Sequence, residues 1–329
     1  MDHGRSPLLG SLTVAVSASL FGLLGVLSRQ AYELGLTPFA FVAWRAGVGA
    51  VASGLFIVWG LRRGGSLVRW SSLDRRARAS LAVAALMGTT LNLAMFLAFA
   101  RIPIAVALLC FYLYPALVAG ASAVLGWERL DRGRIVALAI AIGGMVAVVL
   151  GGTGAGAAIG LDPLGVGLSL SAGVSQAIFV LVSRRGYRTV PTDQAMGLIL
   201  AGAAVIAGAV TVAVDGALAL RGPLLDPQLL GLVVFTGLFA AAIPSFLFLA
   251  GIRWIGAVRA GILMLFEPLV GVALAAAFLA ETVGPVQLAG GLAILAAAVI
   301  LQRSGSPETA IRPAGEPEPM DATVTQTRP

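Results

Sequence analysis

The sequence contains no lysine, one cysteine and one histidine. A single cysteine, Cys110, cannot form a disulfide within the chain or build a cysteine-ligated metal cluster. The single histidine, His3, precedes the first apolar stretch, so catalytic and zinc sites that need several histidines are excluded. We therefore expect no metal, no other cofactor and no enzymatic site of these kinds.

Charged residues are also scarce: they make up 11% of the 329 residues, while 59% are hydrophobic and the mean hydropathy is +0.97. An ordinary soluble domain is about a quarter charged and about half apolar. The apolar runs are long and continuous, whereas the strands of membrane barrels alternate apolar and polar residues. The composition predicts an all-α integral membrane protein whose surroundings are a lipid bilayer.

A helix needs about 20 apolar residues to cross a bilayer. Ten segments approach this length: residues 8–28, 38–61, 79–100, 103–126, 134–151, 163–183, 194–214, 227–250, 256–279 and 285–302. Prolines mark many of the joints and suit the first turn of a new helix: Pro38, Pro103, Pro163, Pro191, Pro227 and Pro285. We interpret residues 8–28 as a retained first span, because no cleavage motif follows them. Residues 303–329, which are rich in proline, are predicted to form a disordered tail.

The 22 basic residues are all arginine, and they lie mostly between the apolar runs. A net charge of +7 can indicate nucleic-acid binding, but this placement favours an effect on topology. If residues 1–7 are cytoplasmic, 18 arginines lie on the cytoplasmic side and three lie outside. This bias predicts ten spans with both termini in the cytoplasm of a cell-membrane protein, and no nucleic-acid partner. The arginine run at 62–78 could also bind anionic lipid, although setting the orientation explains it sufficiently.

The two halves of the chain, residues 8–151 and 163–302, carry matching signals. Pro115 corresponds to Pro268, and Glu128 corresponds to Glu281, both at an offset of 153. Because five spans is an odd number, the second half must enter the membrane in the opposite sense. The fold class predicted is therefore ten transmembrane helices in two inverted five-helix repeats, a construction common among transporters.

Two stretches then resemble a known family. They are LYPALVAGASAVLGWERL at 113–130 and FEPLVGVALAAAFLAET at 266–282. The pair Trp44-Arg45 in the second segment also resembles the family. They are similar to the EamA-type members of the drug/metabolite transporter superfamily. The resemblance covers roughly residues 8–302 and implies two inverted five-helix repeats around a central cavity. It also implies export of small metabolites as the commonest activity. The second stretch departs from the pattern, because Thr-Val rather than Arg-Leu follows Glu281.

Glu267 is the only ionisable residue deep within its apolar segment. A charge near the middle of the bilayer costs about 2.5–3.5 kcal/mol, so this side chain should face the protein interior or a wet cavity. Three roles are open. Glu267 could bind a proton or a substrate ammonium group, it could pair with Arg45 or Arg259, or it could remain protonated and hydrogen-bonded.

Pro115 and Pro268 predict a kink in each half. Proline lacks an N–H, so we expect the carbonyls of Phe111 and Met264 to be freed. Free carbonyls at membrane depth occur only inside protein or along a cavity. The two kinks should therefore flank the substrate site, unless they only improve packing.

The remaining candidates are polar groups inside the spans. Asn92 corresponds to Ser245 at the same offset, and Gln176 lies in the sixth span. These three are candidates for the cavity wall, or for hydrogen bonds between helices. Tyr112 and Tyr114 flank the first kink and could line a cavity or only pack.

Three charged side chains receive a structural interpretation. Arg45 could reach the outer interface or pair with a carboxylate. Glu128 and Glu281 lie at span ends, where they should anchor loops or pair with nearby arginines.

The pattern favours a secondary transporter that works by alternating access on a small metabolite, an amino acid or a drug-like compound. No phosphate-binding motif for ATP is present, so a proton gradient is the expected energy source, with Glu267 as the protonatable group. A monomer or a homodimer would fit. Two alternatives remain: a membrane enzyme acting on lipids or isoprenoids, and a membrane sensor that transports nothing.

Overall fold

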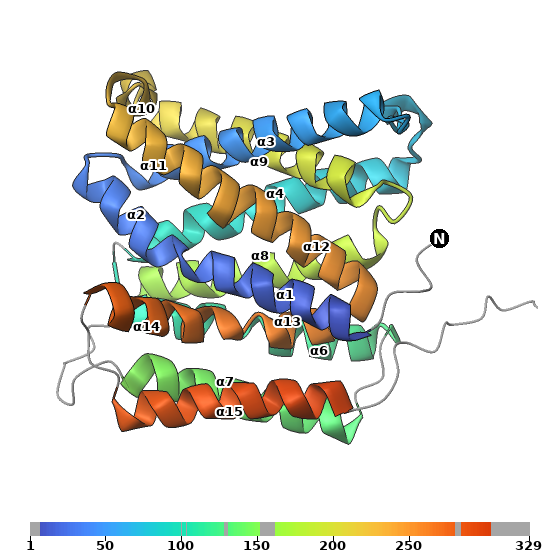
Figure 1. The fold of residues 1–329 in the computed structure, drawn as a ribbon, viewed down its shortest axis with the longest axis vertical. Helices are drawn as coiled ribbons and strands as arrows, with labels where there is room; N and C mark the ends of the chain where they lie inside the picture. Colours follow the sequence, from blue (N-terminus) through green and yellow to red (C-terminus); the bar gives the residue numbers. More distant parts are fainter. Residues whose placement is uncertain are drawn as a thin grey trace, which may run out of the picture.

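The structure is a computed structural model that describes residues 7–99, 101–102, 104–127, 131–151, 162–279 and 284–303. These residues form helices and no strands, as the composition predicts (Figure 1). The first half contains α1 (Pro7–Gly22), α2 (Leu24–Glu33), α3 (Pro38–Arg62), α4 (Arg75–Phe99), α5 (Ile104–Phe111), α6 (Tyr114–Val124) and α7 (Arg132–Gly151). The second half contains α8 (Pro163–Arg185), α9 (Thr192–Val214), α10 (Gly222–Leu225), α11 (Pro227–Gly237), α12 (Ile243–Ile255), α13 (Ala257–Leu263), α14 (Phe266–Leu279) and α15 (Pro285–Arg303). Short 3-10 turns lie at Trp70–Ser72 and Ala217–Leu220, and the π-helical turn η3 (Leu238–Ala242) joins α11 to α12.

Eight helical stretches of the described residues are long and apolar enough to cross a bilayer, so the chain is a multi-pass membrane protein. The two other predicted spans differ for local reasons. One is divided into α13 and α14, and the other is represented by a shorter apolar helix, Pro285–Ile300. The total of ten spans stays a prediction.

Proline and capping side chains set where many of these helices begin. Helices start at Pro38, Pro163, Pro227 and Pro285, whereas Pro191 precedes α9 by one residue. Pro103 lies outside the described residues. These positions suit proline because the first turn of a helix needs no N–H donor.

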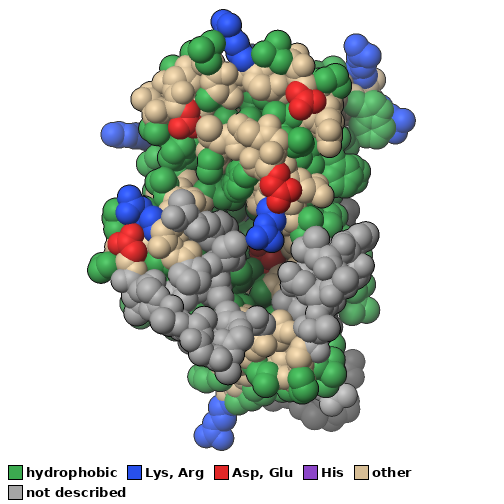
Figure 2. Space-filling view, turned by 90° about the vertical axis from the view of Figure 1, so that its left-hand side faces the viewer, with side chains coloured by type: hydrophobic (Ala, Val, Ile, Leu, Met, Phe, Trp, Pro, Cys, Tyr) green, Lys and Arg blue, Asp and Glu red, His purple; other side chains and the backbone are tan. Residues whose placement is uncertain are grey.

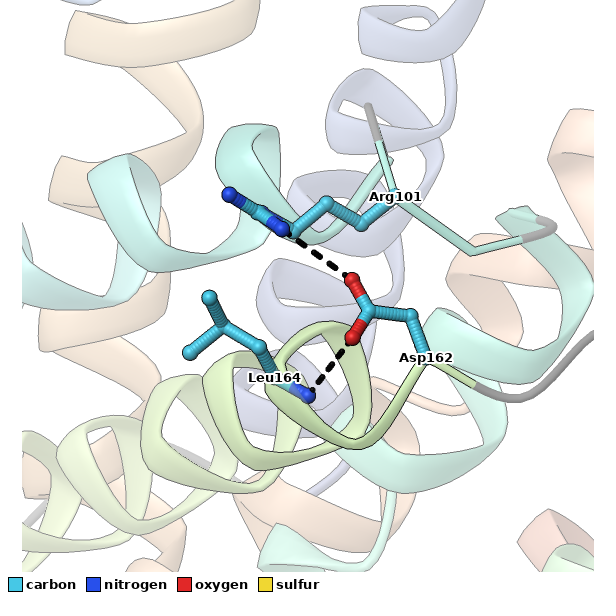
Figure 3. Close-up of polar contacts among 3 residues, drawn as sticks. All are labelled: Arg101, Asp162 and Leu164. Carbon is cyan, nitrogen blue, oxygen red and sulfur yellow. Dashed lines mark hydrogen bonds and ion pairs between the residues drawn. The ribbon is translucent and has the colours of Figure 1, made fainter.

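At the start of α8, one aspartate links the two halves of the chain (Figure 3). Asp162 Oδ1 accepts the Leu164 N–H at 3.0 Å, which is an N-cap, and its Oδ2 lies 3.1 Å from the Arg101 guanidinium. The hydrogen bond from Leu164 and the one from Arg101 lower the pKa of the Asp162 carboxyl. Arg101 follows α4, so this exposed pair joins the first half to the second.

The helices of the two halves pack in an exchange-symmetric pattern. The closely packed pairs are α7 with α15, α3 with α9, α4 with α8, and α1 with α12. In the order of the spans, α7 and α15 are counterparts, and so are α3 and α9. Exchanging the two halves turns the α4–α8 pair into the α1–α12 pair, because α8 is the counterpart of α1 and the span that contains α12 is the counterpart of α4. Figure 1 shows α3 and α9 side by side and running in opposite directions, as an inverted repeat requires.

The two ends of the molecule differ in how tightly they pack. The start of α1 and the end of α15 lie at the same end, together with the loops 63–74 and 186–191 (Figure 1). At that end every residue of α13 is buried. The turn between α12 and α13 is made by Gly256, whose φ of 89° favours glycine. The opposite end is hollowed near its centre, and an acidic side chain is visible inside the hollow (Figure 2).

Candidate functional site

Two helices break at corresponding positions near the centre of the molecule. The α5–α6 segment is interrupted at Tyr112 and Leu113, and the α13–α14 segment is interrupted at Met264 and Leu265. Discontinuous helices related by an inverted repeat are typical of binding sites in membrane proteins. At the places of the two predicted kinks, the structure therefore has two interruptions between consecutive helices.

The prediction that Pro268 frees the Met264 carbonyl is wrong. Met264 O accepts the Glu267 N–H at 3.0 Å, in a tight turn that closes the break. Pro268 lies in the first turn of α14, where no helical donor is needed. Pro115 occupies the same place in α6. Each proline thus marks the start of a new half-helix rather than a kink inside a continuous one.

Glycines let neighbouring helices approach the two breaks. A Cβ on Gly261 of α13 would lie 3.6 Å from Pro115, so α13 rests directly on the start of α6. A Cβ on Gly173 of α8 would lie 3.0 Å from the Phe111 carbonyl oxygen, and one on Gly22 would lie 3.1 Å from the Glu267 carbonyl oxygen. Both breaks are therefore packed against a helix backbone.

Glu267 is in the first turn of α14, deep in the molecule, yet part of its surface stays accessible. This combination fits a side chain that faces an internal hollow. The Tyr112 hydroxyl is within reach of its carboxyl and can donate to it. The Arg45 guanidinium interacts with the carboxyl electrostatically. Of the predicted roles, the position allows both proton binding and pairing with Arg45.

Arg45 comes from α3 and is 6% exposed. Its guanidinium donates to Asn92 Oδ1 on α4 and, at 3.4 Å, to the Ala240 carbonyl oxygen. Ala240 belongs to η3, and π-helical turns frequently occur at functional sites. Asn92 also donates to the Gly88 carbonyl at 2.7 Å, so both ends of its amide are engaged. Three helical segments thus hold the guanidinium beside Glu267.

Tyr112 and Tyr114 are each 1% exposed; Tyr112 lies in the α5–α6 break and Tyr114 is the first residue of α6. Both rings pack on Phe111, with centroids 5.2 and 5.4 Å away. The buried Gln176 of α8 lies close to the Tyr114 hydroxyl, without the geometry of a regular hydrogen bond. We define Glu267, Arg45, Asn92, Tyr112 and Tyr114 as the central cluster.

The EamA-like transporter family matches residues 8–150 and 163–303, which together are most of the chain. The chain belongs to this family. Members of the EamA-like family are transporters and not enzymes, and the two matched ranges show that the chain contains two copies of the family's unit.

The fold of this EamA-like chain also has a counterpart among solved structures. A crystal structure described only as "Crystal structure of protein" superposes with a TM-score of 0.70 at 20% identity, over 91% of this chain and 98% of that one. At this identity the likeness shows the fold alone. No curated protein matches the sequence.

Some predicted residues are not part of the central cluster of this EamA-like chain. Ser245 is partly buried in α12, and no hydrogen bond of the described residues joins it to the cluster. Glu128 and Glu281 lie outside the described residues.

The sequence did not predict one group of contacts of this EamA-like chain, which we call the Arg253 lock. It lies at the end of the molecule where the termini lie. Arg253, in the last turn of α12, donates to the Val190 carbonyl at 2.8 Å, to Thr192 Oγ1 at 3.0 Å and to the Tyr187 carbonyl at 3.1 Å. Arg184 of α8 donates to the Arg253 carbonyl. In the sequence these arginines counted only toward topology, and no local signal distinguished them from the other basic residues.

Tyr187 completes this lock. Burial raises the pKa of Tyr187 to about 12, so its hydroxyl is neutral at physiological pH. That hydroxyl shares a hydrogen bond of 2.6 Å with Ser183 Oγ, and its ring lies 5.4 Å from the Arg253 guanidinium. The cation–π contact adds to the two hydrogen bonds that hold the 186–191 loop against α12 and to the third, which holds the start of α9.

Proposed function

We propose that the chain is a secondary active transporter of the cell membrane that exports a small metabolite, amino acid or drug-like compound by alternating access. The observation that carries this proposal is Glu267, a partly accessible carboxyl in the first turn of α14. The molecule that contains it is hollowed at one end (Figure 2), and every residue of α13 is buried towards the other end. The hollow faces outward if the termini are cytoplasmic. The arrangement then corresponds to an outward-facing state in which the Arg253 lock closes the cytoplasmic side.

The proposed coupling ion is the proton, and Glu267 is its carrier. The deprotonated carboxylate is attracted to Arg45 and can accept the Tyr112 hydroxyl, so it holds α14 against α3 and the α5–α6 break. Protonation removes that attraction and weakens the contact between these elements. A cationic or zwitterionic substrate that binds the same carboxylate would compete with the proton, and such competition is the basis of antiport.

Two experiments test this proposal in sequence. An untargeted comparison of the metabolites retained and released by cells with and without the gene identifies the substrate. Purified protein in vesicles then provides flux of that substrate under an imposed pH gradient. We expect Glu267→Gln to abolish the response of flux to the gradient, because an amide cannot exchange the proton.

The matched control is Glu33→Gln, which removes an exposed carboxylate at the end of α2. It should leave gradient-driven flux unchanged. Unchanged proton-driven flux in the Glu267→Gln protein would remove Glu267 from the coupling role. If no metabolite differs between the two kinds of cell, export itself is refuted.

The ten-span topology with both termini in the cytoplasm is part of the same proposal. It is supported by the arginine distribution and by the positions of α13, α14 and α15. Single cysteines at Gly35 and Gly64, in a Cys110→Ala background, test it. An impermeant reagent added to intact cells should label the first and spare the second, and the reverse pattern would overturn the orientation.

A further inference from the structure

The loop that Arg253 holds has a counterpart in the first half of the chain. The held loop, residues 186–191, follows α8, and residues 34–37 follow α2 at the hollowed end (Figure 1). At an offset of 155, the two helix ends and loops share a serine, an arginine, a tyrosine and a threonine. The corresponding pairs are Ser28 with Ser183, Arg29 with Arg184, Tyr32 with Tyr187, and Thr37 with Thr192. The residue types of the Arg253 lock are therefore present at both ends of the molecule.

The two loops also fold alike. The Val190 N–H donates to the Tyr187 carbonyl at 3.1 Å. At the corresponding positions the Gly35 N–H donates to the Tyr32 carbonyl at 2.9 Å. In the lock, the Tyr187 carbonyl also accepts Arg253, because a carbonyl oxygen has two lone pairs. The Tyr32 carbonyl therefore occupies the place of an acceptor that Arg253 uses.

An arginine that corresponds to Arg253 is present as well. Residues 97–106 read LAFARIPIAV and residues 249–258 read LAGIRWIGAV, at an offset of 152. They belong to corresponding spans, and five of the ten positions are identical. Leucine, alanine and valine are common in membrane helices, so the informative identity is the arginine, Arg101 opposite Arg253.

The two ends differ in how far these residues are buried. Tyr187 is 0% exposed and Val190 is 1% exposed at the end where the termini lie. At the hollowed end, Tyr32 is only partly buried, and Gly35 and Arg101 are exposed. The same set of residues is thus assembled at one end and apart at the other.

Arg101 and Thr37 have other partners in this arrangement. The Arg101 guanidinium lies 3.1 Å from Asp162 Oδ2, and the two side chains are 45% and 34% exposed, so solvent screens the pair (Figure 3). Thr37 Oγ1 donates to Asp215 and accepts the Ala40 N–H at 3.2 Å. A hydroxyl oxygen has two acceptor sites, so Thr37 can also accept an N–H from an arginine.

The span that carries the 34–37 loop is divided where it meets the central cluster. It is interrupted at Leu23, between α1 and α2, whereas its counterpart α8 is continuous. A Cβ on Gly22 would lie 3.1 Å from the Glu267 carbonyl oxygen, so this interruption lies against the first turn of α14. A change at Glu267 can therefore alter the angle at which α2 leaves α1.

We propose that Arg101 forms a second lock, which closes the hollowed end when the other end opens. The proposal rests on the alternating access proposed above, in which one half moves against the other. On closure, α2 turns about Leu23, and Arg101 leaves Asp162. Arg101 then donates to the carbonyls of Tyr32 and Gly35 and to Thr37 Oγ1, as Arg253 does in its own lock.

The test is the direction in which two substitutions change one labelling rate. The reporter is Ala260→Cys, which is buried behind the Arg253 lock, in a Cys110→Ala background. Adding Arg253→Gln opens that end often enough for both slower and faster labelling by an impermeant maleimide to be measured. The rate follows the population of the state that the Arg101 lock stabilises.

Arg101→Gln should slow the labelling by at least about tenfold, because several bonds from a charged donor are lost only in that state. Asp162→Asn should accelerate it by up to about fivefold, because only the exposed pair that retains Arg101 is lost. Asparagine still caps α8. The matched control is Arg221→Gln, which removes an exposed arginine beside α10 at the hollowed end and should leave the rate unchanged.

Opposite signs for the two variants support the second lock, because loss of a purely structural ion pair would change the rate in the same direction in both. An unchanged or faster rate in Arg101→Gln overturns it. Equal slowing in Arg221→Gln also overturns it, since loss of positive charge would then be the cause. Size-exclusion profiles of all variants identify any effect of unfolding. These rates need no substrate, so their outcome is separate from the flux that tests the proposed function.

Discussion

On the alternating-access mechanism proposed above, the Arg253 lock predicts how a single substitution redistributes the two states. In Arg253→Gln the side chain becomes shorter and neutral, so it cannot span the three acceptors on the 186–191 loop and Thr192. A hydrogen bond from a charged donor contributes about 1.5–3 kcal/mol. Because Arg253 is partly exposed and glutamine can keep one contact, we take the loss as roughly 2–4 kcal/mol.

That loss is felt only in the state that makes these contacts. At about 1.4 kcal/mol per factor of ten, the population of the state open at this end should rise by roughly thirtyfold to several hundredfold. The increase has an upper limit, because it cannot exceed a fully open population.

The assay is the labelling rate of one cysteine placed behind the lock. Ala260 of α13 is 0% exposed, so Ala260→Cys in a Cys110→Ala background should react slowly with an impermeant maleimide. Adding Arg253→Gln should raise the rate by the same factor as the open population. The control, Arg62→Gln, removes an exposed arginine at the end of α3 and should change nothing.

Two results would refute this reasoning. An unchanged labelling rate in Arg253→Gln would mean that these hydrogen bonds are present in both states. An equal rise in Arg62→Gln would mean that loss of positive charge alone opens the protein. Size-exclusion profiles of all variants ensure that faster labelling does not come from unfolded protein.

Two further predictions concern stability. A Cβ on Gly144 would lie 2.7 Å from the Gly290 carbonyl oxygen, whereas one on Gly143 would meet nothing within 4 Å. The Gly144→Ala protein should therefore be less stable than the Gly143→Ala protein by about 1–3 kcal/mol. Equal midpoints of thermal denaturation in detergent would contradict the close α7–α15 packing. The pKa of Asp162 is lowered in the fold, chiefly by the Leu164 N–H, so its charge stabilises the protein above its ordinary pKa of about 3.9, and this contribution disappears as the pH falls through the lowered value. The wild type should therefore exceed Asp162→Asn in thermal stability at neutral pH and approach it in strong acid, and a gap that does not depend on pH would exclude the charge as its cause.

The sequence predicted those parts of the fold that depend on local chemistry. Long apolar runs form helices in any membrane context, and a proline such as Pro163 or Pro227 fixes a helix start because it cannot donate an N–H. Kinks near Pro115 and Pro268 were predicted for the same reason, and the structure has an interruption between two helices at each place. The error at Met264 arose because a proline was treated as interrupting one helix, whereas the chain begins a second helix there.

The sequence could not predict the polar contacts between distant elements. Asn92 lies 47 positions beyond Arg45, and the Ala240 carbonyl is available only because the chain forms a π-helical turn at that place. No periodicity signals such a turn. The partners of Arg253 are backbone carbonyls of another loop, and every residue type carries a backbone carbonyl. Side-chain patterns therefore identified Arg45 and Asn92 as candidates, but they gave no information about the partners of Arg253.

The difference between Tyr114 and Glu267 has a physical reason within an otherwise repeated scaffold. Both occupy the first turn of the half-helix that follows a break, where the helix dipole favours a negative charge. A carboxylate at both places would put two like charges beside the crossing of α6 and α13, and each would oppose ionisation of the other. The tyrosine fills its site with a neutral, fully buried ring. One carboxyl then faces one guanidinium, Arg45, so a single protonation event changes the net charge of the central cluster.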